Sequence, residues 1–179
     1  GRRCLEAYVA GFETITKLVM SLRQRSEDGW HPPSSFGSFG AGVACAKLQG
    51  LNQSQVEMTL GTAASMASGL VCNFGTMSKP LHVGLGARNG VVAAKLAQSG
   101  FTANKQGIEA GLGFYEVFYP GAEPDTRPLN ELGTAYELIN SGIRIKPYPC
   151  GGLTHPAIDG VLEFKTKYGI TAEMVESID

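Results

Sequence analysis

The spacing of apolar residues predicts a chain that is mainly helical. Between Arg3 and Arg25 the apolar residues recur at steps of three and one, which is the spacing of one face of an amphipathic helix. Three more helices are predicted, each beginning at a residue suited to capping a helix and ending at or near a glycine. The clearest start is Asn52 followed by Gln55, a capping-box pair. These three helices cover residues 36–49, 52–68 and 78–99.

Glycines inside two of these helices predict unusually close helix packing. The chain has 24 glycines, nearly twice the roughly 7% of average composition. A glycine inside a helix costs up to about 1 kcal/mol relative to alanine, so a packing reason is expected. The helix over 36–49 contains Gly37, Gly40 and Gly42, and the helix over 78–99 contains Gly84, Gly86 and Gly90.

The pattern changes in the last third of the chain. Residues 121–128 are polar and rich in Gly and Pro, so we expect a boundary there, with residues 1–122 forming part of an all-helical domain. Alternation of apolar and basic residues predicts a short strand near 142–147, and apolar spacing predicts a helix near 155–168. One strand cannot form a sheet, so residues 123–179 are interpreted as a linker and the start of a small α/β domain whose other strands lie elsewhere.

Charge and composition exclude several classes of partner. The chain has 15 basic and 16 acidic residues, a net charge of −1, so we expect no nucleic-acid partner. No apolar run reaches the roughly 18–20 residues that span a bilayer, and the start of the chain has no signal-peptide pattern, so we expect no membrane partner and a cytoplasmic location. The four cysteines are far apart, which favours buried thiols over a disulfide, a metal site or an iron–sulfur cluster. The first residue is Gly1 rather than Met, so the chain is expected to be an internal piece of a longer protein.

Basic side chains next to predicted helix starts point to an anionic ligand. His31 precedes Pro32, Lys79 precedes Pro80 and His155 precedes Pro156. Helix N-termini carry partial positive charge and free N–H groups, which suit a carboxylate or a phosphate. A cation beside such an end is disfavoured unless an anion is bound, so Lys79 is a candidate general base.

Each of these residues also has a simpler interpretation. Lys79 can be a solvated lysine in a loop, and His31 a structural histidine between two bulky neighbours. His155 could form an anion nest with Lys146 and the Gly-Gly turn at 151–152, or belong to an ordinary strand–turn–helix connection. His82, in the first turn of its predicted helix, is interpreted as a surface or core residue.

Four segments in the same order resemble a known family. They are GWHPP at 29–33, FGSFGAG at 36–42, NFGTMSKPLHVG at 73–84 and KPYPCGGLTHPAID at 146–159. Together they resemble the 2-methylcitrate dehydratase family, MmgE/PrpD, over nearly the whole chain. The resemblance implies a large all-helical domain followed by a smaller α/β domain, a homodimer, an active site between the two domains and a role in propionate metabolism.

The resemblance also implies a chemistry and a set of residues. Family members abstract a proton next to a carboxylate of a small di- or tricarboxylic acid, without a cofactor or metal, and then lose water, lose CO₂ or take the proton back on the other face. By position, His31 and Lys79 resemble the residues of proton transfer, Lys146 resembles a basic residue that binds substrate, and His155 is a further candidate for substrate binding. The competing interpretation is a non-catalytic, truncated helical module whose Gly- and Ala-rich helices serve oligomer packing.

Overall fold

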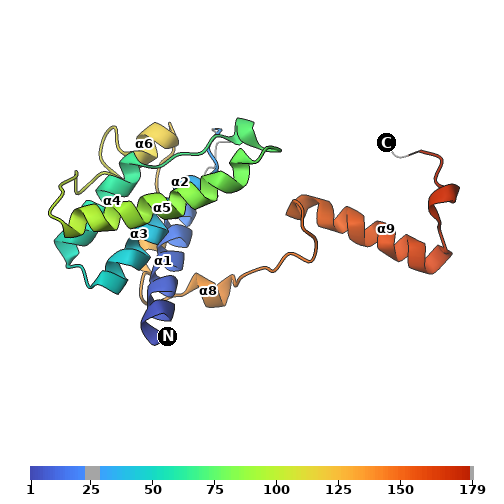
Figure 1. Ribbon diagram of the computed structural model, residues 1–179, viewed down its shortest axis with the longest axis horizontal. Helices are drawn as coiled ribbons and strands as arrows, with labels where there is room; N and C mark the ends of the chain where they lie inside the picture. The colour runs from blue at the N-terminus through green and yellow to red at the C-terminus, as the bar shows by residue number, and fades with distance from the viewer. Residues whose placement is uncertain (23–28, 178–179) are drawn as a thin grey trace. The chain divides into compact units, whose positions relative to one another are not determined.

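The structure, a computed structural model, describes residues 1–22 and 29–177, and its regular elements in these ranges are helices (Figure 1). This confirms the mainly α class. The chain divides into two units, Gly1–Gly142 and Ile143–Asp179. The division falls after Gly142, whereas the sequence pattern placed a boundary at residues 122 and 123. No helix in the described ranges is both long and apolar enough to cross a membrane.

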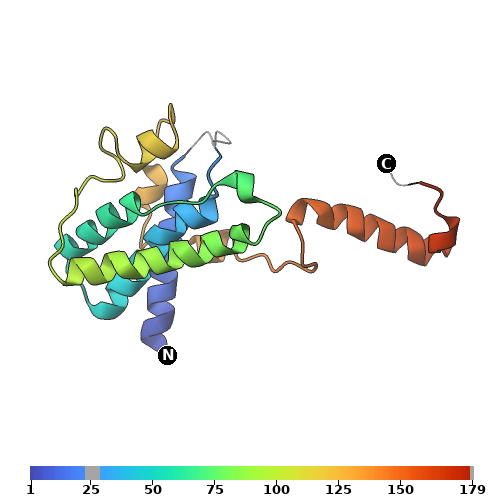
Figure 2. The ribbon, with the colours of Figure 1, turned by 45° about the horizontal axis from the view of Figure 1, so that its top comes forward.

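The helices of the first unit pack around α3, which contacts α1, α4 and α5 (Figures 1 and 2). The predicted first helix ends at Met20 in the structure, and the part of that prediction that falls on 23–25 lies outside the described residues. The bounds are α1 Arg2–Met20, α2 Pro32–Ser35, α3 Gly37–Gln49, α4 Gln53–Ser65, η1 Val71–Asn73, α5 Ser78–Gln98, α6 Phe114–Phe118, α7 Arg127–Asn130 and α8 Glu137–Asn140.

Glycines bring α3 into direct backbone contact with its neighbours. A Cβ added at Gly90 of α5 would lie 2.5 Å from the backbone nitrogen of Gly42 in α3. A Cβ added at Gly11 of α1 would lie 2.5 Å from the backbone oxygen of Gly40 in α3. No real Cβ fits at such distances, so these glycines allow the close packing that the sequence predicted for α3 and α5. The contribution of α1 through Gly11 was not predicted.

A second close contact joins α5 to the short helix α2. A Cβ added at Gly86 would lie 2.7 Å from the backbone oxygen of Ser34. Gly37 and Gly84, in contrast, have nothing within 4 Å of an added Cβ. The packing prediction is therefore wrong for these two positions, which face open space.

Aromatic side chains fill the core of the first unit. The ring of Phe114 in α6 meets Phe39 at 4.8 Å and Phe36 at 5.1 Å between centroids, and Phe39 is fully buried. Trp30 lies against Phe118 of the same helix, with ring centroids 4.5 Å apart. The core therefore holds the segment that leads into α2.

A buried ion pair fastens α7 and α8 to α1. Lys17 is completely buried, and its Nζ donates to Glu131 Oε2 at 2.9 Å and to Glu137 Oε1 at 3.1 Å. The Glu13 carboxylate accepts hydrogen bonds from the backbone nitrogens of Glu137 and Leu138, both at 2.9 Å. These contacts explain why the first unit continues to Gly142.

The second unit contains η2 Gly152–Thr154, α9 His155–Tyr168 and η3 Ala172–Met174. The helix α9 has the bounds predicted from sequence. Residues 142–147, where a strand is predicted, have no regular secondary structure. Apolar side chains of α9, including Val161, Leu162 and Phe164, are exposed. The α/β domain thus stays a prediction.

Candidate functional site

The backbone of His31 is fixed at the start of α2. His31 is the N-cap residue, in extended conformation, and Pro32 follows it in the first turn. Its carbonyl oxygen accepts hydrogen bonds from the nitrogens of Ser34 at 2.9 Å and Ser35 at 3.1 Å, and its own N–H donates to the oxygen of Gly69 at 2.9 Å. These bonds bury the residue, which is 7% exposed. Pro32 therefore sets where α2 begins. The loop after α4, through Gly69, holds the backbone of His31 in place.

Phe74 joins His31 to Lys79. The imidazole of His31 meets the Phe74 ring edge-on, with centroids 4.9 Å apart. The Nζ of Lys79 lies 4.2 Å from the centroid of the same ring, within the range of a cation–π interaction. Lys79 is exposed and lies in the first turn of α5. The structure thus brings the two sequence candidates to one aromatic ring.

The loop between Phe74 and α5 is closed by a threonine. Thr76 Oγ1 donates to the carbonyl oxygen of Asn73 at 2.7 Å and accepts from the backbone nitrogen of Ser78 at 3.2 Å. The hydroxyl therefore links η1 to the start of α5. Its two hydrogen bonds hold the loop in the conformation that places Lys79 over Phe74.

His82 is a third member of the cluster, and sequence reasoning missed it. It is buried, 7% exposed, and its ring centroid lies 5.7 Å from that of His31. Its carbonyl oxygen accepts a hydrogen bond from Ser34 Oγ at 2.8 Å. One signal could have found it, because residues three apart on a helix share a face and His82 follows Lys79 by three.

The electrostatics of the cluster keep His31 neutral. Burial lowers the pKa of the His31 imidazole below its ordinary value of 6.5, and the positive charges of His82 and Lys79 lower it further. An imidazolium needs an acceptor at both nitrogens, yet Nδ1 of His31 and Nδ1 of His82 are buried without a hydrogen-bond partner among the described residues. A neutral imidazole beside a lysine can accept a proton from a bound anion.

The other two predicted residues, Lys146 and His155, both belong to the second unit. Lys146 Nζ donates to the carbonyl oxygen of Cys150 at 3.2 Å. The ring of Tyr148 meets that of His155 edge-on, with centroids 5.3 Å apart. The Tyr148 hydroxyl donates a hydrogen bond to the carboxylate of Asp159. His155 Nε2 is buried without a partner among the described residues. The structure thus brings together His31 and Lys79 in the first unit, and Lys146 and His155 each contact a residue of the 148–150 segment in the second.

The Gly-Gly turn before α9 has the geometry of an ordinary connection. Neither Gly151 nor Gly152 has a positive φ, and Gly152 begins the single turn of η2. The carbonyl oxygen of Gly151 accepts from the nitrogen of Thr154 at 3.0 Å and from its hydroxyl at 2.7 Å. These bonds direct the chain into α9 and place His155 at its first position.

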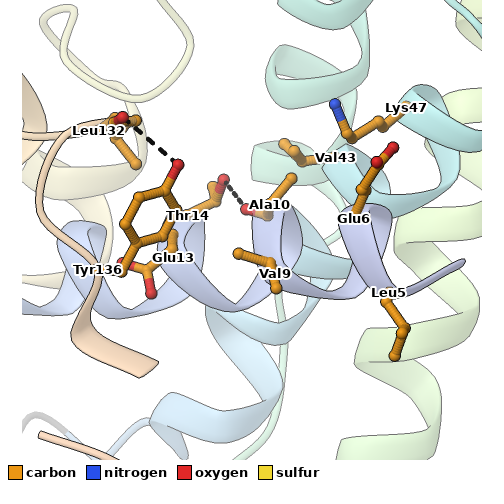
Figure 3. Close-up of a pocket in the computed structure, with 11 residues that line it drawn as sticks. Leu5, Glu6, Val9, Ala10, Glu13, Thr14, Val43, Lys47, Leu132 and Tyr136 are labelled. Atoms are coloured by element: carbon orange, nitrogen blue, oxygen red, sulfur yellow. Dashed lines mark hydrogen bonds between the residues drawn. The ribbon is translucent and has the colours of Figure 1, made fainter. Parts of the chain in front are cut away.

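A separate groove lies along the first half of α1 (Figure 3). It has a volume of about 630 Å³ and is lined largely by apolar side chains, among them Val9, Val43 and Leu132. Glu6 and Lys47 lie side by side in Figure 3, and Glu13 lines the groove near Tyr136. None of the four predicted site residues lines this groove. Its apolar surface does not suit a ligand with several carboxylates.

Metal ligands do not gather in the described part of the chain. Over residues 1–22 and 29–177 no group of three or more His, Cys, Asp and Glu side chains is placed to hold a metal ion. The described groups around His31 are instead imidazoles, an ammonium and an aromatic ring. A buried imidazole next to a lysine at a helix start has the chemistry to bind a small organic anion and to move a proton.

Comparison with known proteins gives the family. The model of the MmgE/PrpD N-terminal domain matches residues 1–127. The chain therefore belongs to the MmgE/PrpD family, as its four sequence segments indicated. The matched range contains His31, Lys79 and His82.

Curated relatives are named as decarboxylases. The chain is 31% identical to cis-aconitate decarboxylase of Mus musculus over 175 residues, which is 97% of this chain and 35% of the relative. It is 31% identical to cis-aconitate decarboxylase of Homo sapiens over 163 residues, 89% of this chain and 33% of the relative. It is 30% identical to the enzyme of that name from Aspergillus terreus over 171 residues, 90% of this chain and 34% of the relative. The chain spans about a third of the length of the curated relatives it matches.

Proposed function

We propose that this chain is part of a lyase or isomerase that acts on a small di- or tricarboxylate by proton transfer, with His31 and Lys79 at its centre. The observation that carries the proposal is their meeting on the ring of Phe74, within the residues that the family model matches. The names of the relatives favour cis-aconitate as the first substrate to test, and loss of CO₂ as the first reaction.

The geometry supports a division of labour between the two residues. His31 is neutral near pH 7 because burial lowers the pKa of its imidazole, so it can accept a proton from carbon next to a carboxylate. The electrons left on that carbon delocalise into the carboxylate, whose growing negative charge the Lys79 ammonium stabilises. In a decarboxylation the carbon–carbon bond to the departing CO₂ breaks instead, and the carbanion takes a proton from the site.

Lys146 and His155 are proposed to bind the substrate's other carboxylates. Both lie at the loop and helix start where Tyr148 and Cys150 hold them. The proposal also includes the homodimer, the cytoplasmic location, the role in propionate metabolism and the absence of a cofactor that the family resemblance implies. Dehydration and epimerisation use the same first proton transfer and are alternatives within the same site.

The test is turnover by the full gene product that contains this chain. Purified enzyme is incubated with cis-aconitate, 2-methylcitrate and iminodisuccinate, and loss of each is followed by chromatography. We expect turnover of at least one, reduced about 10²–10³-fold by Lys79→Ala, the range that a group stabilising negative charge in the transition state contributes.

The matched control is Lys95→Ala, an exposed lysine in the last turn of the same helix α5. It should keep the wild-type rate. No turnover of any of the three compounds by a folded wild-type enzyme contradicts the proposal and favours the non-catalytic helical module. Equal rates for the Lys79 and Lys95 variants contradict the role of Lys79.

A further inference from the structure

We propose that His82 is a positioning residue for His31: the two buried imidazoles form a pair that holds its members in place and admits one proton but opposes a second. This inference rests on the proposed function, in which His31 accepts the substrate's proton. The ring of His82 lies 5.7 Å from that of His31 between centroids, and we propose that His82 acts through this neighbour.

The backbone of the pair is held by bonds and close contacts from both sides. Ser34 Oγ donates to the His82 carbonyl oxygen at 2.8 Å, and the His31 N–H donates to the Gly69 oxygen at 2.9 Å. Gly69 has φ +109, and a Cβ added there would lie 2.9 Å from Ser34 Cβ and 3.4 Å from His82 Cγ. With Gly86 packed against Ser34, three residues, Ser34, Gly69 and Gly86, fix the spacing of the two histidine backbones.

On each imidazole, Nδ1 has no hydrogen-bond partner among the described residues. Both residues are 7% exposed, and both Nδ1 atoms are buried without a hydrogen bond to a described residue. A buried polar atom without a partner is rare and calls for a reason. For His31, an imidazolium would place an N–H donor at Nδ1 without an acceptor among the described residues, and burial opposes its charge as well.

The charged and titratable groups around His31 add to the same effect. From α5, His82 and Lys79 both act on its charge, and both lower the pKa of His31 after the larger effect of burial. The helix α2 and residues 66–70 carry no charged side chain, and η1 carries Cys72, which is exposed. Among the described residues the groups that act on the charge of His31 are therefore basic, and none is a carboxylate.

The experiment is a pH titration of the three histidines by NMR. The chain has only His31, His82 and His155, so the ¹³Cε1–¹H resonances of histidine-labelled protein can be assigned by single substitutions. In the wild type, we expect His31 to titrate below pH 6.5 with a curve that departs from a single-site shape. In His82→Gln, which keeps a polar side chain but cannot take a positive charge, we expect the midpoint of His31 to rise.

The control is Lys95→Ala in the last turn of α5, which should leave the His31 titration unchanged. An unchanged His31 midpoint in a folded His82→Gln variant overturns the proposal. If the His82→Gln variant does not fold, the NMR titration curve of His31 in the wild type tests the proposal by itself. A single-site titration with its midpoint at pH 6.5 overturns the proposal.

A kinetic readout separates positioning from a merely structural role. In the full gene product, His82→Gln should move the acidic limb of the kcat/KM profile upward by the shift that NMR measures for His31. A loss of kcat/KM by the same factor at every pH counts against the pair. The NMR result does not depend on turnover, so failure of the proposed function and failure of the pair are distinguishable.

Discussion

The contact between Gly86 and Ser34 is the feature that sets the spacing of α2 and α5, and Gly86→Ala tests it. An added Cβ would lie 2.7 Å from the Ser34 backbone oxygen, which cannot turn away as a flexible side chain could. The helices must separate, and His31 then shifts relative to His82. Gly84→Ala is the matched control, because it lies two residues earlier on the same helix with nothing within 4 Å of the new Cβ.

The two substitutions should change stability in opposite directions. Alanine is favoured over glycine in a helix by about 0.5–1 kcal/mol, and Gly84→Ala should gain this amount. Gly86→Ala gains the same propensity but pays about 1–3 kcal/mol for overpacking, so its free energy of unfolding should fall by about 1–2 kcal/mol. For a chain of this size each kcal/mol corresponds to roughly 2–4 °C in Tm.

The assay is urea unfolding at 25 °C, followed by circular dichroism at 222 nm. We expect the order of stability Gly84→Ala, wild type, Gly86→Ala. The ¹³Cε1–¹H resonances of His31 and His82 should move in the Gly86 variant and stay in place in the Gly84 variant. A Gly86 variant as stable as the Gly84 variant would refute the argument that these two helices meet backbone to backbone.

Three further predictions concern charge, pH and capping. Lys17→Met should lower Tm at pH 7, because it leaves the buried carboxylate of Glu137 without its cation. Hydrogen bonding from a nearby serine and then from Lys17 lowers the pKa of Glu137, so this stabilisation is present above pH 4.5 and is lost as the pH falls. A Tm difference between wild type and Lys17→Met that stays constant from pH 7 to 3 contradicts the ion pair. Burial lowers the pKa of His31, so the unfolded chain binds a proton at this residue more readily than the folded chain. The wild type should therefore lose stability relative to His31→Gln between pH 7 and 5. A difference in the free energy of urea unfolding that stays constant across that range contradicts this prediction. Asn52→Ala removes the cap whose side chain accepts a hydrogen bond from the nitrogen of Gln55 at 3.0 Å, and should lower the free energy of urea unfolding by about 1 kcal/mol. An unchanged free energy of unfolding would count against the capping box.

The helices could be predicted because their signals are local. The apolar face of α1, the capping box at Asn52 and Gln55, and the bounds of α9 all follow from residues within one or two turns. Both hydrogen bonds of the capping box are present, so that prediction is confirmed. Local spacing does not say which face of a helix meets a partner, which is why Gly37 and Gly84 were assigned to contacts that the structure does not have.

The buried ion pair could not be predicted because its partners are far apart in sequence. Lys17 lies 114 residues from Glu131 and 120 from Glu137. A lysine in an amphipathic helix is expected to lie in solvent, and only the packing of α7 and α8 against α1 buries it. The same long-range packing holds α7 and α8 in the first unit, which ends at Gly142.

The candidate site was predicted in part. His31 and Lys79 were chosen from their places at helix starts and from the family segments, and the structure places both against Phe74. The ring that joins them was not foreseen, since Phe74 is separated from His31 by the whole of α3 and α4. His82 was missed for the same reason, because its burial depends on α2 packing across α5.

The most direct test of the account is a double-mutant cycle on kcat/KM in the full gene product. His31→Gln, Lys79→Ala and the double variant are compared with wild type on the substrate that the enzyme turns over. Two groups that act on one substrate as a unit give losses that do not multiply. The account predicts a double variant about as slow as the slower single variant, and a loss equal to the product of the two single losses would contradict it.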